Sequence, residues 1–218
     1  MGRLIVFEGI DGSGKSTQFQ RLCACMSQAG ITYTKLSFPR YDKPSSALIR
    51  MYLAGEFGTN PSDVSPYAAS TFYAVDRWAA YQSEWAADYA ADTLILADRY
   101  TTSNAVHQGA KLHGDKRVAF FQWLDEFEHE KLELPRPDIV LYMDVDAETA
   151  FANLRARQEK TATAPDIHEG AGTYLQSCLS AAVDAAKFYG WHSISCAENG
   201  VMRAEEDIHR EILGKIDL

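Results

Sequence analysis

The residues whose types and spacing most clearly indicate a chemical function lie near the start of the chain, in the segment GIDGSGKS at residues 9–16. It fits the pattern G-x-x-x-x-G-K-[ST], whose glycines let consecutive backbone N–H groups turn inward around phosphate oxygens. An apolar run precedes it and a helical pattern follows, so a helix N-terminus would add its positive end. The pattern predicts Mg-ATP as cofactor, with Lys15 reaching the β and γ phosphates and Ser16 ligating magnesium. The predicted nucleotide-binding residues are Gly12, Ser13, Gly14, Lys15, Ser16 and Thr17.

Two aspartates lie where they could act on such a nucleotide. Asp11 lies inside the loop, where a carboxylate beside a triphosphate is repelled unless a cation or an acceptor group lies between them. Asp98 ends a later apolar run, at the edge of the predicted sheet where ligands bind in open α/β folds. We expect Asp11 to act near magnesium or on an acceptor hydroxyl. We expect the Asp98 carboxylate to accept a hydrogen bond from a magnesium-bound water. The competing interpretations are a tight Asp-Gly turn and a helix cap.

Three arginines at predicted strand ends or on a predicted helix could bind a second phosphate. Arg40 follows a strand, Arg99 directly follows Asp98, and Arg77 comes one turn after Tyr73 on a long helix. Arginine suits this task because its planar fork can bind two phosphate oxygens at once. An aromatic ring one turn away could stack on a base. The alternative for each arginine taken singly is an ordinary surface position.

A polar, glycine-bearing segment near residues 159–172 is preceded by the basic residues Arg155, Arg157 and Lys160. We interpret residues 155–172 as a lid that closes over ATP, excludes water and brings arginine to the γ phosphate. A plain solvated loop would have a similar composition.

The elements that must position these residues alternate along the chain. Apolar runs predict strands at residues 3–8, 33–38, 93–97, 137–145 and 191–196. Helical patterns occupy residues 18–28, 66–91, 118–131, 147–158, 174–189 and 204–216, with a further helix beginning near Pro44. Alternating strands and helices predict a parallel sheet covered on both faces. We therefore expect an α/β fold, a three-layer P-loop NTPase sandwich with five parallel strands and a short lid, as one domain over residues 1–218.

The overall composition limits the partners. The chain carries 30 acidic against 21 basic side chains, a net charge of −9 that argues against nucleic acid. Its four cysteines lack zinc spacing and are expected as free thiols in a reducing compartment. No apolar run approaches the roughly 20 residues that cross a bilayer, and the first residues do not form a signal peptide. We therefore expect a cytoplasmic protein without membrane partners.

The motifs together resemble those of thymidylate kinases, which phosphorylate dTMP to dTDP with Mg-ATP. The resemblance runs over nearly the whole chain, from FEGIDGSGKST through FPRY, FYAVDRW, DRYTTSNAVHQGAK and PDIVLYMDV to the lid. It implies dTMP as the small-molecule substrate. It also implies a homodimer formed through long helices, for which the helix beginning at Pro66 is a candidate.

The resemblance also implies roles for matching positions. Arg40 and Arg77 would hold the acceptor phosphate, with Arg99 between donor and acceptor. Tyr73 would stack on thymine, and Asn104 would contact its ring. The implied catalytic residues are Asp11, Lys15, Arg99, Arg155 and Arg157, and the metal residues are Ser16 and Asp98. The implied substrate residues are Asp11, Phe38, Pro39, Arg40, Tyr73, Arg77, Arg99, Ser103, Asn104 and Gln108.

Some positions depart from part of the family. Gly12 stands where one branch has a P-loop arginine, so the chain resembles the branch that supplies this cation from the lid. His107 and His168 stand where some relatives have tyrosine. Alternatives are a kinase for another nucleoside monophosphate or for a deoxynucleoside, a P-loop switch or motor, and a metabolite ligase. A deoxynucleoside would leave the paired arginines without purpose, and a motor would hydrolyse ATP without an acceptor.

Overall fold

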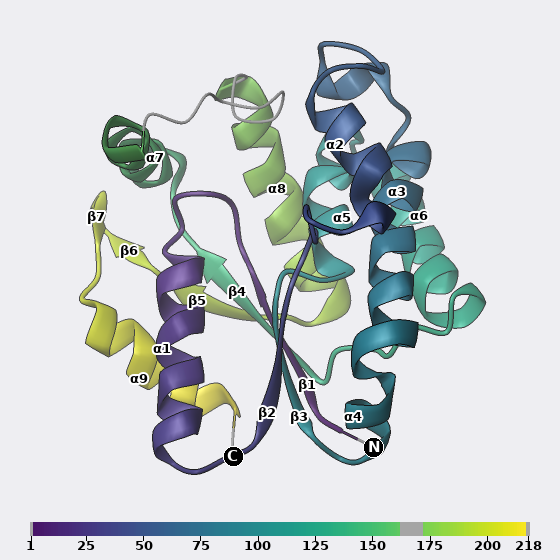
Figure 1. The fold of residues 1–218 in the computed structure, drawn as a ribbon. Helices are drawn as coiled ribbons and strands as arrows, with labels where there is room; N and C mark the ends of the chain where they lie inside the picture. Colours follow the sequence, from purple (N-terminus) through teal and green to yellow (C-terminus); the bar gives the residue numbers. More distant parts are fainter. Residues whose placement is uncertain (1, 162–171, 217–218) are drawn as a thin grey trace.

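The computed structural model describes residues 2–161 and 172–216, with side chains described over 2–155 and 174–216 (Figure 1). Its central sheet has the strand order β2-β3-β1-β4-β5, and all four pairings are parallel. The strands are β1 (Leu4–Glu8), β2 (Tyr33–Ser37), β3 (Leu94–Asp98), β4 (Ile139–Asp144) and β5 (His192–Ser195). The prediction of five parallel strands is confirmed.

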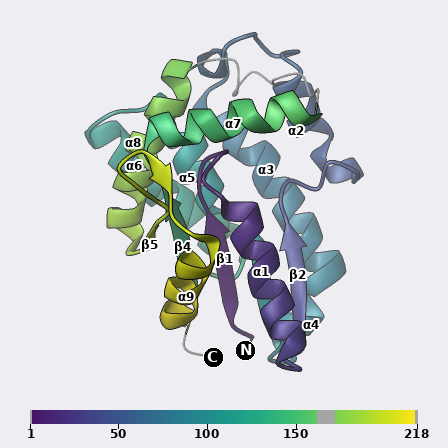
Figure 2. The same ribbon diagram turned by 90° about the vertical axis from the view of Figure 1, so that its left-hand side faces the viewer.

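Helices cover both faces of this sheet (Figures 1 and 2). They are α1 (Lys15–Gln28), α2 (Ala47–Leu53), α3 (Pro66–Ala80), α4 (Ala86–Ala90), α5 (Thr102–His107), α6 (Asp115–Asp125), α7 (Ala147–Thr161), α8 (Gly172–Tyr189) and α9 (Glu205–Ile216). Two π-helical segments continue helices, η3 (Tyr81–Trp85) after α3 and η5 (Glu126–Lys131) after α6. Short 3₁₀ turns are η1 (Pro44–Ser46), η2 (Pro61–Asp63) and η4 (Gly109–Lys111).

The alternation of side chains along β1 divides the core into two layers. Ile5 and Phe7 pack with Phe19 of α1 on one face. Leu4 and Val6 pack on the other face, in the same cluster as Trp85 at the end of η3. All five residues of β1 are buried, as expected for a central strand of a parallel sheet.

The strand register brings three loops together at one edge of the sheet. Phe7 of β1 and Ser37 of β2 are both paired with Asp98 of β3. Backbone hydrogen bonds continue past the strand ends, from Arg99 N to Phe7 O at 3.0 Å and from Phe38 N to Asp98 O at 3.0 Å. The segments after β1, β2 and β3, which carry most of the predicted site, therefore lie side by side.

The structure differs from the sequence prediction mainly in short elements. Helix α1 begins at Lys15, before its first apolar stripe residue, Phe19. Helix α5 and the antiparallel hairpin β6 (Ala197–Glu198) and β7 (Val201–Met202) were not predicted, because they are too short to show a period. Within the described residues, no helix is both long and apolar enough to cross a membrane.

Candidate active site

The loop between β1 and α1 has the backbone geometry of a phosphate cradle. Gly12 and Gly14 adopt φ values of +85° and +81°, which side-chain-bearing residues rarely adopt. A Cβ on Gly12 would also lie 2.4 Å from the carbonyl oxygen of Ala150. Gly14 caps α1, whose first turn carries no acidic residue. The buried Ser13 hydroxyl has no hydrogen-bond partner among the described residues, so a ligand oxygen could satisfy it.

Two cavities open on this loop. The P-loop cavity, of about 470 Å³, is lined by Ile10, Asp11, Gly12, Ser13, Gly14, Lys15, Ser16, Thr17, Gln18, Asn153, Met202, Arg203, Glu205 and Ile208. The arginine cavity, of about 370 Å³, is lined by Asp11, Lys15, Ser16, Ser37, Phe38, Pro39, Tyr41, Leu53, Tyr73, Arg77, Asp98, Arg99, Tyr100, Ser103, Asn104, His107 and Gln108. Asp11, Lys15 and Ser16 line both cavities. All six predicted nucleotide-binding residues line the first, and every predicted substrate residue except Arg40 lines the second.

Charged side chains surround the junction of the two cavities. Lys15 Nζ pairs with the Asp98 carboxylate. Arg99 donates from Nη2 to Asp11 Oδ1 at 2.7 Å and from Nη1 to Glu8 Oε1 at 3.3 Å. Arg99 itself has φ +67°, a backbone conformation that is uncommon outside glycine. The structure therefore brings Asp11, Lys15, Arg99 and Asp98 together, as the sequence predicted.

Glu8, at the end of β1, is a site residue that the sequence analysis missed. Its carboxylate is fully buried and accepts hydrogen bonds from Gly9 N at 2.9 Å, Thr102 Oγ1 at 2.6 Å and Ser103 Oγ at 2.6 Å. With Arg99, these contacts connect β1 to the start of α5. Since Ser103 is held by Glu8, its hydroxyl is oriented by the protein.

Neighbouring charges alter the acid–base behaviour of the junction. Burial raises the pKa of Asp11, but the neighbouring cations, Arg99 first and Lys15 after it, outweigh burial and leave that pKa below its usual value. Burial, with help from Arg99, lowers the pKa of Lys15 against the opposing effect of Asp98. Burial disfavours the charge of Arg99, but Asp11 and Glu8 reverse this and raise its pKa. Asp11 is therefore a carboxylate at neutral pH, and Arg99 stays cationic.

His107 lies beside this cluster in the arginine cavity. Its Nε2 is 3.1 Å from Arg99 Nη1, and its Nδ1 is 3.8 Å from the Cys178 sulfur. Because an arginine can only donate, Nε2 must accept, which assigns the proton of the neutral ring to Nδ1.

A second polar cluster lines the arginine cavity but not the P-loop cavity. Arg77 is buried and donates from Nε to Glu128 Oε2 at 2.7 Å and from Nη1 to Tyr100 O at 3.3 Å. Asn104 Nδ2 donates to Glu128 Oε1 at 2.9 Å. Gln108 is fully buried, and neither atom of its amide has a partner among the described residues. Such an orphaned amide in a cavity wall indicates that a ligand or water binds there.

Comparison with known proteins identifies the family. A profile of the family described as thymidylate kinase matches residues 7–208. The chain belongs to the thymidylate kinase family. It is therefore an enzyme of the nucleotide kinase type, in a family that uses ATP.

Individual relatives agree with this assignment. A thymidylate kinase of Mycobacterium tuberculosis is 36% identical over 158 residues, which is 72% of each chain. A probable thymidylate kinase of Methanothermobacter thermautotrophicus is 29% identical over 206 residues, or 94% of this chain and 92% of that one. A solved structure of thymidylate kinase from Candida albicans covers 99% of this chain and 91% of its own, with a TM-score of 0.69. That structure is 20% identical and supports the P-loop NTPase fold.

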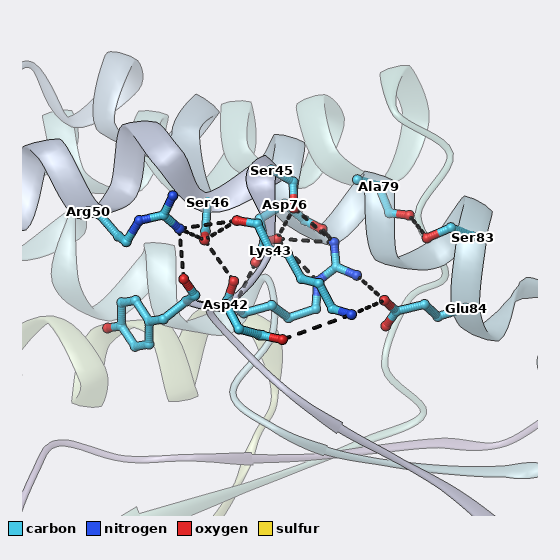
Figure 3. A network of polar contacts seen from close by, with 11 residues as sticks. Asp42, Lys43, Ser45, Ser46, Arg50, Asp76, Ala79, Ser83 and Glu84 are labelled. Atoms are coloured by element: carbon cyan, nitrogen blue, oxygen red, sulfur yellow. Dashed lines mark hydrogen bonds and ion pairs between the residues drawn. The ribbon is translucent and has the colours of Figure 1, made fainter.

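Arg40, which the thymidylate kinase resemblance implied for the acceptor phosphate, lies in a network of contacts beside the arginine cavity. It does not line the arginine cavity. Its Nε donates to Asp76 Oδ1 at 3.1 Å, its Nη2 donates to Ser45 Oγ and the Asp76 carbonyl, and its Nη1 pairs with Glu84 at 2.7 Å. Figure 3 shows this network around Asp76, Ser45 and Glu84. All three guanidinium nitrogens contact protein atoms in this structure, and binding of the acceptor phosphate by Arg40 stays a prediction.

The network fixes the loop that carries Tyr41, a cavity residue that the sequence analysis did not select. Asp76 also accepts from Arg40 N at 2.9 Å, and Arg50 donates to Tyr41 O at 2.7 Å. The loop is therefore held from α3 and α2 at once. Its residues Phe38, Pro39 and Tyr41 line the arginine cavity.

The lid of this thymidylate kinase family member is only partly described. Figure 2 shows α7, which begins the predicted lid, crossing over the sheet edge that carries the P-loop. Arg155 is exposed on α7 and lines neither cavity. The Arg157 side chain and His168 lie outside the described residues. Asn153 of α7 donates to Gly12 O at 2.8 Å, and with Met202 and Arg203 it lines the P-loop cavity, a set that no sequence motif indicated.

The predicted metal ligands Ser16 and Asp98 both offer oxygen atoms, the donors that magnesium prefers. Ser16 and Asp98 both line the arginine cavity next to Lys15. Across the described part of the chain, no group of three or more His, Cys, Asp or Glu side chains could hold a metal by itself. Magnesium in phosphoryl-transfer sites is commonly held by one or two protein groups plus substrate phosphates and waters. The residues present therefore fit a magnesium ion that arrives with the nucleotide.

Proposed function

We propose that this chain transfers the γ-phosphoryl group of ATP to dTMP and releases dTDP and ADP. The observation that carries the proposal is the junction of the two cavities at Asp11, Lys15 and Ser16. ATP would occupy the P-loop cavity, with its γ phosphate at this junction. The acceptor would occupy the arginine cavity, with its phosphate facing the same point. Phosphoryl transfer depends on aligning these two groups and neutralising the charge between them.

The protein supplies cations from both sides of the junction. Lys15 would leave Asp98 and bind the β and γ phosphates, because the triphosphate carries more charge than one carboxylate. Arg99 would bind the acceptor phosphate while Asp11 and Glu8 hold its guanidinium in place. Magnesium, held through Ser16 and Asp98, would neutralise charge on the transferred group. Arg155 and Arg157 would add positive charge from the lid when it closes.

The part of the arginine cavity lined by Arg77 and Asn104 suits a base better than a phosphate. The positive charge of Arg77 is already balanced by Glu128, with both side chains nearly fully buried. We therefore assign Arg77, with Asn104, to the base rather than to the acceptor phosphate that the resemblance implied, and Tyr73 to stacking against the base. Selection of thymine over uracil would rest on one methyl group, worth about 1–3 kcal/mol, so discrimination against dUMP would be partial.

A label-transfer experiment tests this function. The chain is incubated with dTMP, magnesium and ATP labelled in the γ-phosphoryl group, and the products are separated by ion exchange. The proposal expects label in dTDP at the same rate as ADP appears. Label released chiefly as inorganic phosphate, at a rate independent of dTMP, would identify a P-loop ATPase instead.

We also propose that two copies of the chain pair through α3, in a reducing cytoplasmic environment. Tyr67, Val75 and Trp78 lie on one stripe of α3 and are 40%, 52% and 44% exposed. All four cysteines are free, which suits such an environment. Light scattering of the wild type and of Val75→Glu tests the pairing: a dimer that dissociates in the variant supports it, and a wild-type monomer at micromolar concentration refutes it.

A further inference from the structure

A buried carboxylate lies behind the base end of the arginine cavity. Glu128 comes from the π-helical segment η5 and is 0% exposed, next to Arg77 at 1% and Asn104 at 2%. Its two oxygens accept from Arg77 Nε and Nη2, and Oε1 also accepts from Asn104 Nδ2. Arg77 and Asn104 line the cavity, whereas Glu128 does not. Glu128 would therefore act on a ligand only through these two side chains.

The orientation of the Asn104 amide follows from these contacts. Its Nδ2 donates to Glu128 Oε1 at 2.9 Å and to the Ser70 carbonyl at 3.2 Å, which uses both N–H groups. Turning the amide over would place Oδ1 against two acceptor oxygens. The carbonyl oxygen is therefore the atom that Asn104 offers to a ligand, and this atom can only accept.

Arg77 offers the opposite polarity. Glu128 binds its Nε and Nη2, and Tyr100 O accepts from Nη1. Any N–H group that remains for a ligand can only donate, because a guanidinium has no acceptor. Since Arg77 and Asn104 share Oε1 of Glu128, the cavity wall presents a donor and an acceptor next to each other.

We infer that Glu128 is a specificity-determining positioning residue, which fixes this donor–acceptor pair so that it selects a base edge with a carbonyl beside a ring N–H. The inference rests on the proposed transfer to a nucleotide in the arginine cavity. Thymine and uracil present such an edge at C4=O and N3–H. Cytosine presents an amino group and an unprotonated N3, so donor would face donor and acceptor would face acceptor. Guanine has the same edge as thymine, so the cluster rejects cytosine and leaves purines to be excluded by size.

The variant Glu128→Gln tests the inference, because it replaces one oxygen by an NH₂ group of similar size. An NH₂ at the Oε1 position would oppose N–H groups of both Arg77 and Asn104, and an NH₂ at the Oε2 position would oppose Arg77 Nε. In either orientation the donor–acceptor pair is no longer held in place. We expect the ratio of kcat/KM for dTMP to kcat/KM for dCMP to fall about tenfold or more. The KM for ATP should stay within about twofold, since the nucleotide cavity is separate. Glu126→Gln is the control, because Glu126 is exposed on the same segment and pairs only with Lys131 among the described contacts.

Each outcome decides one point. A wild-type chain that does not phosphorylate dTMP refutes the proposed function itself. A wild type that prefers dTMP, together with a folded Glu128→Gln whose ratio equals that of the control, refutes the role of Glu128 alone. If Glu128→Gln does not fold, Glu128→Asp keeps the charge that neutralises Arg77 but withdraws the oxygens by one methylene. Its ratio should then fall partway, and an unchanged ratio overturns the inference.

Discussion

Arg99 donates a 2.7 Å hydrogen bond from Nη2 to Oδ1 of Asp11, although 88 positions separate them in the chain. The contact forms because β1 and β3 are neighbours in parallel register, which puts the loops that follow them at one sheet edge. It lies where the P-loop cavity and the arginine cavity meet. An anion entering from either side therefore approaches a cation that is already oriented by carboxylates.

Replacing Arg99 should slow phosphoryl transfer. Arg99→Ala removes the cation at the junction and leaves the buried Glu8 carboxylate without its ion pair. We expect kcat/KM for dTMP to fall by about 10²–10³-fold, the size seen when one preorganised transition-state donor is lost. Steady-state kinetics measure this, with Arg21→Ala as control, because Arg21 pairs with Glu205 and Glu206 on the surface. A loss below about threefold would remove Arg99 from the junction mechanism.

The Asp76–Arg40 contact should support the acceptor loop. Asp76 is 1% exposed and binds Arg40 through both backbone and guanidinium. Asp76→Ala leaves Arg40 partly unpaired, so we expect a loss of about 1–3 kcal/mol in unfolding free energy and a higher KM for dTMP than for the wild type. The KM for ATP should change less.

The control for that experiment is Glu84→Gln. Glu84 also pairs with Arg40, but its side chain is 40% exposed, so its loss should cost less than about 1 kcal/mol. Urea denaturation and acceptor kinetics on both variants make the comparison. Equal losses of unfolding free energy and equal changes in the KM for dTMP in Asp76→Ala and Glu84→Gln would contradict the assignment of the loop anchor to Asp76.

Asp146 should stabilise the start of α7 in a pH-dependent way. Its carboxylate accepts from Thr149 N and Thr149 Oγ1, both at 2.8 Å, and these hydrogen bonds lower its pKa. Because the folded pKa lies below the unfolded value of 3.8, the stabilisation is complete above that value and is lost as pH falls through the folded pKa. We expect Asp146→Ala to cost about 0.5–2 kcal/mol at pH 7, and this difference to shrink below pH 3.8.

Denaturant unfolding between pH 3 and pH 7 measures the Asp146 effect, with Glu148→Ala as control, because Glu148 is an exposed acid in the first turn of the same helix. A difference in unfolding free energy between wild type and Asp146→Ala that grows on acidification would contradict this role of Asp146 at the start of α7.

Arg155, at the start of the predicted lid, should affect kcat. Arg155 is exposed in this structure and lies on the helix that crosses over the P-loop. If lid closure brings it to the γ phosphate, Arg155→Ala lowers kcat far more than it weakens dTMP binding. Arg210→Ala, on α9, is the matched control, because it removes another exposed arginine. Comparable losses of kcat and dTMP affinity would count against a role in the transition state.

The central sheet and the P-loop could be predicted because both leave continuous local patterns. Each strand is a short apolar run, and the P-loop has a fixed spacing of glycines, lysine and serine. Boundaries shifted by a few residues where polar positions continue a helix, as Lys15 does at the start of α1.

Contacts between residues far apart in the chain could not be predicted from the sequence. The contact of Arg40 with Asp76 could not be predicted, because nothing local shows that a residue 36 positions later binds its guanidinium. Glu8 and Glu128 look like ordinary surface acids in the sequence, yet both are fully buried. Only the packing of α5, η5 and β1 reveals that they orient Arg99, Ser103, Arg77 and Asn104. The residues missed were thus those whose function depends on a partner from another element.

The most direct test of the account is the initial rate of ADP release from Mg-ATP with dTMP, dUMP, dGMP, dCMP, thymidine or no acceptor. Transfer across the junction of the two cavities predicts fast release with dTMP, slower release with dUMP, and little with dCMP, thymidine or no acceptor. ADP release at one rate whatever the acceptor would mean that water receives the phosphoryl group, and it would contradict the assignment of the arginine cavity as the acceptor site.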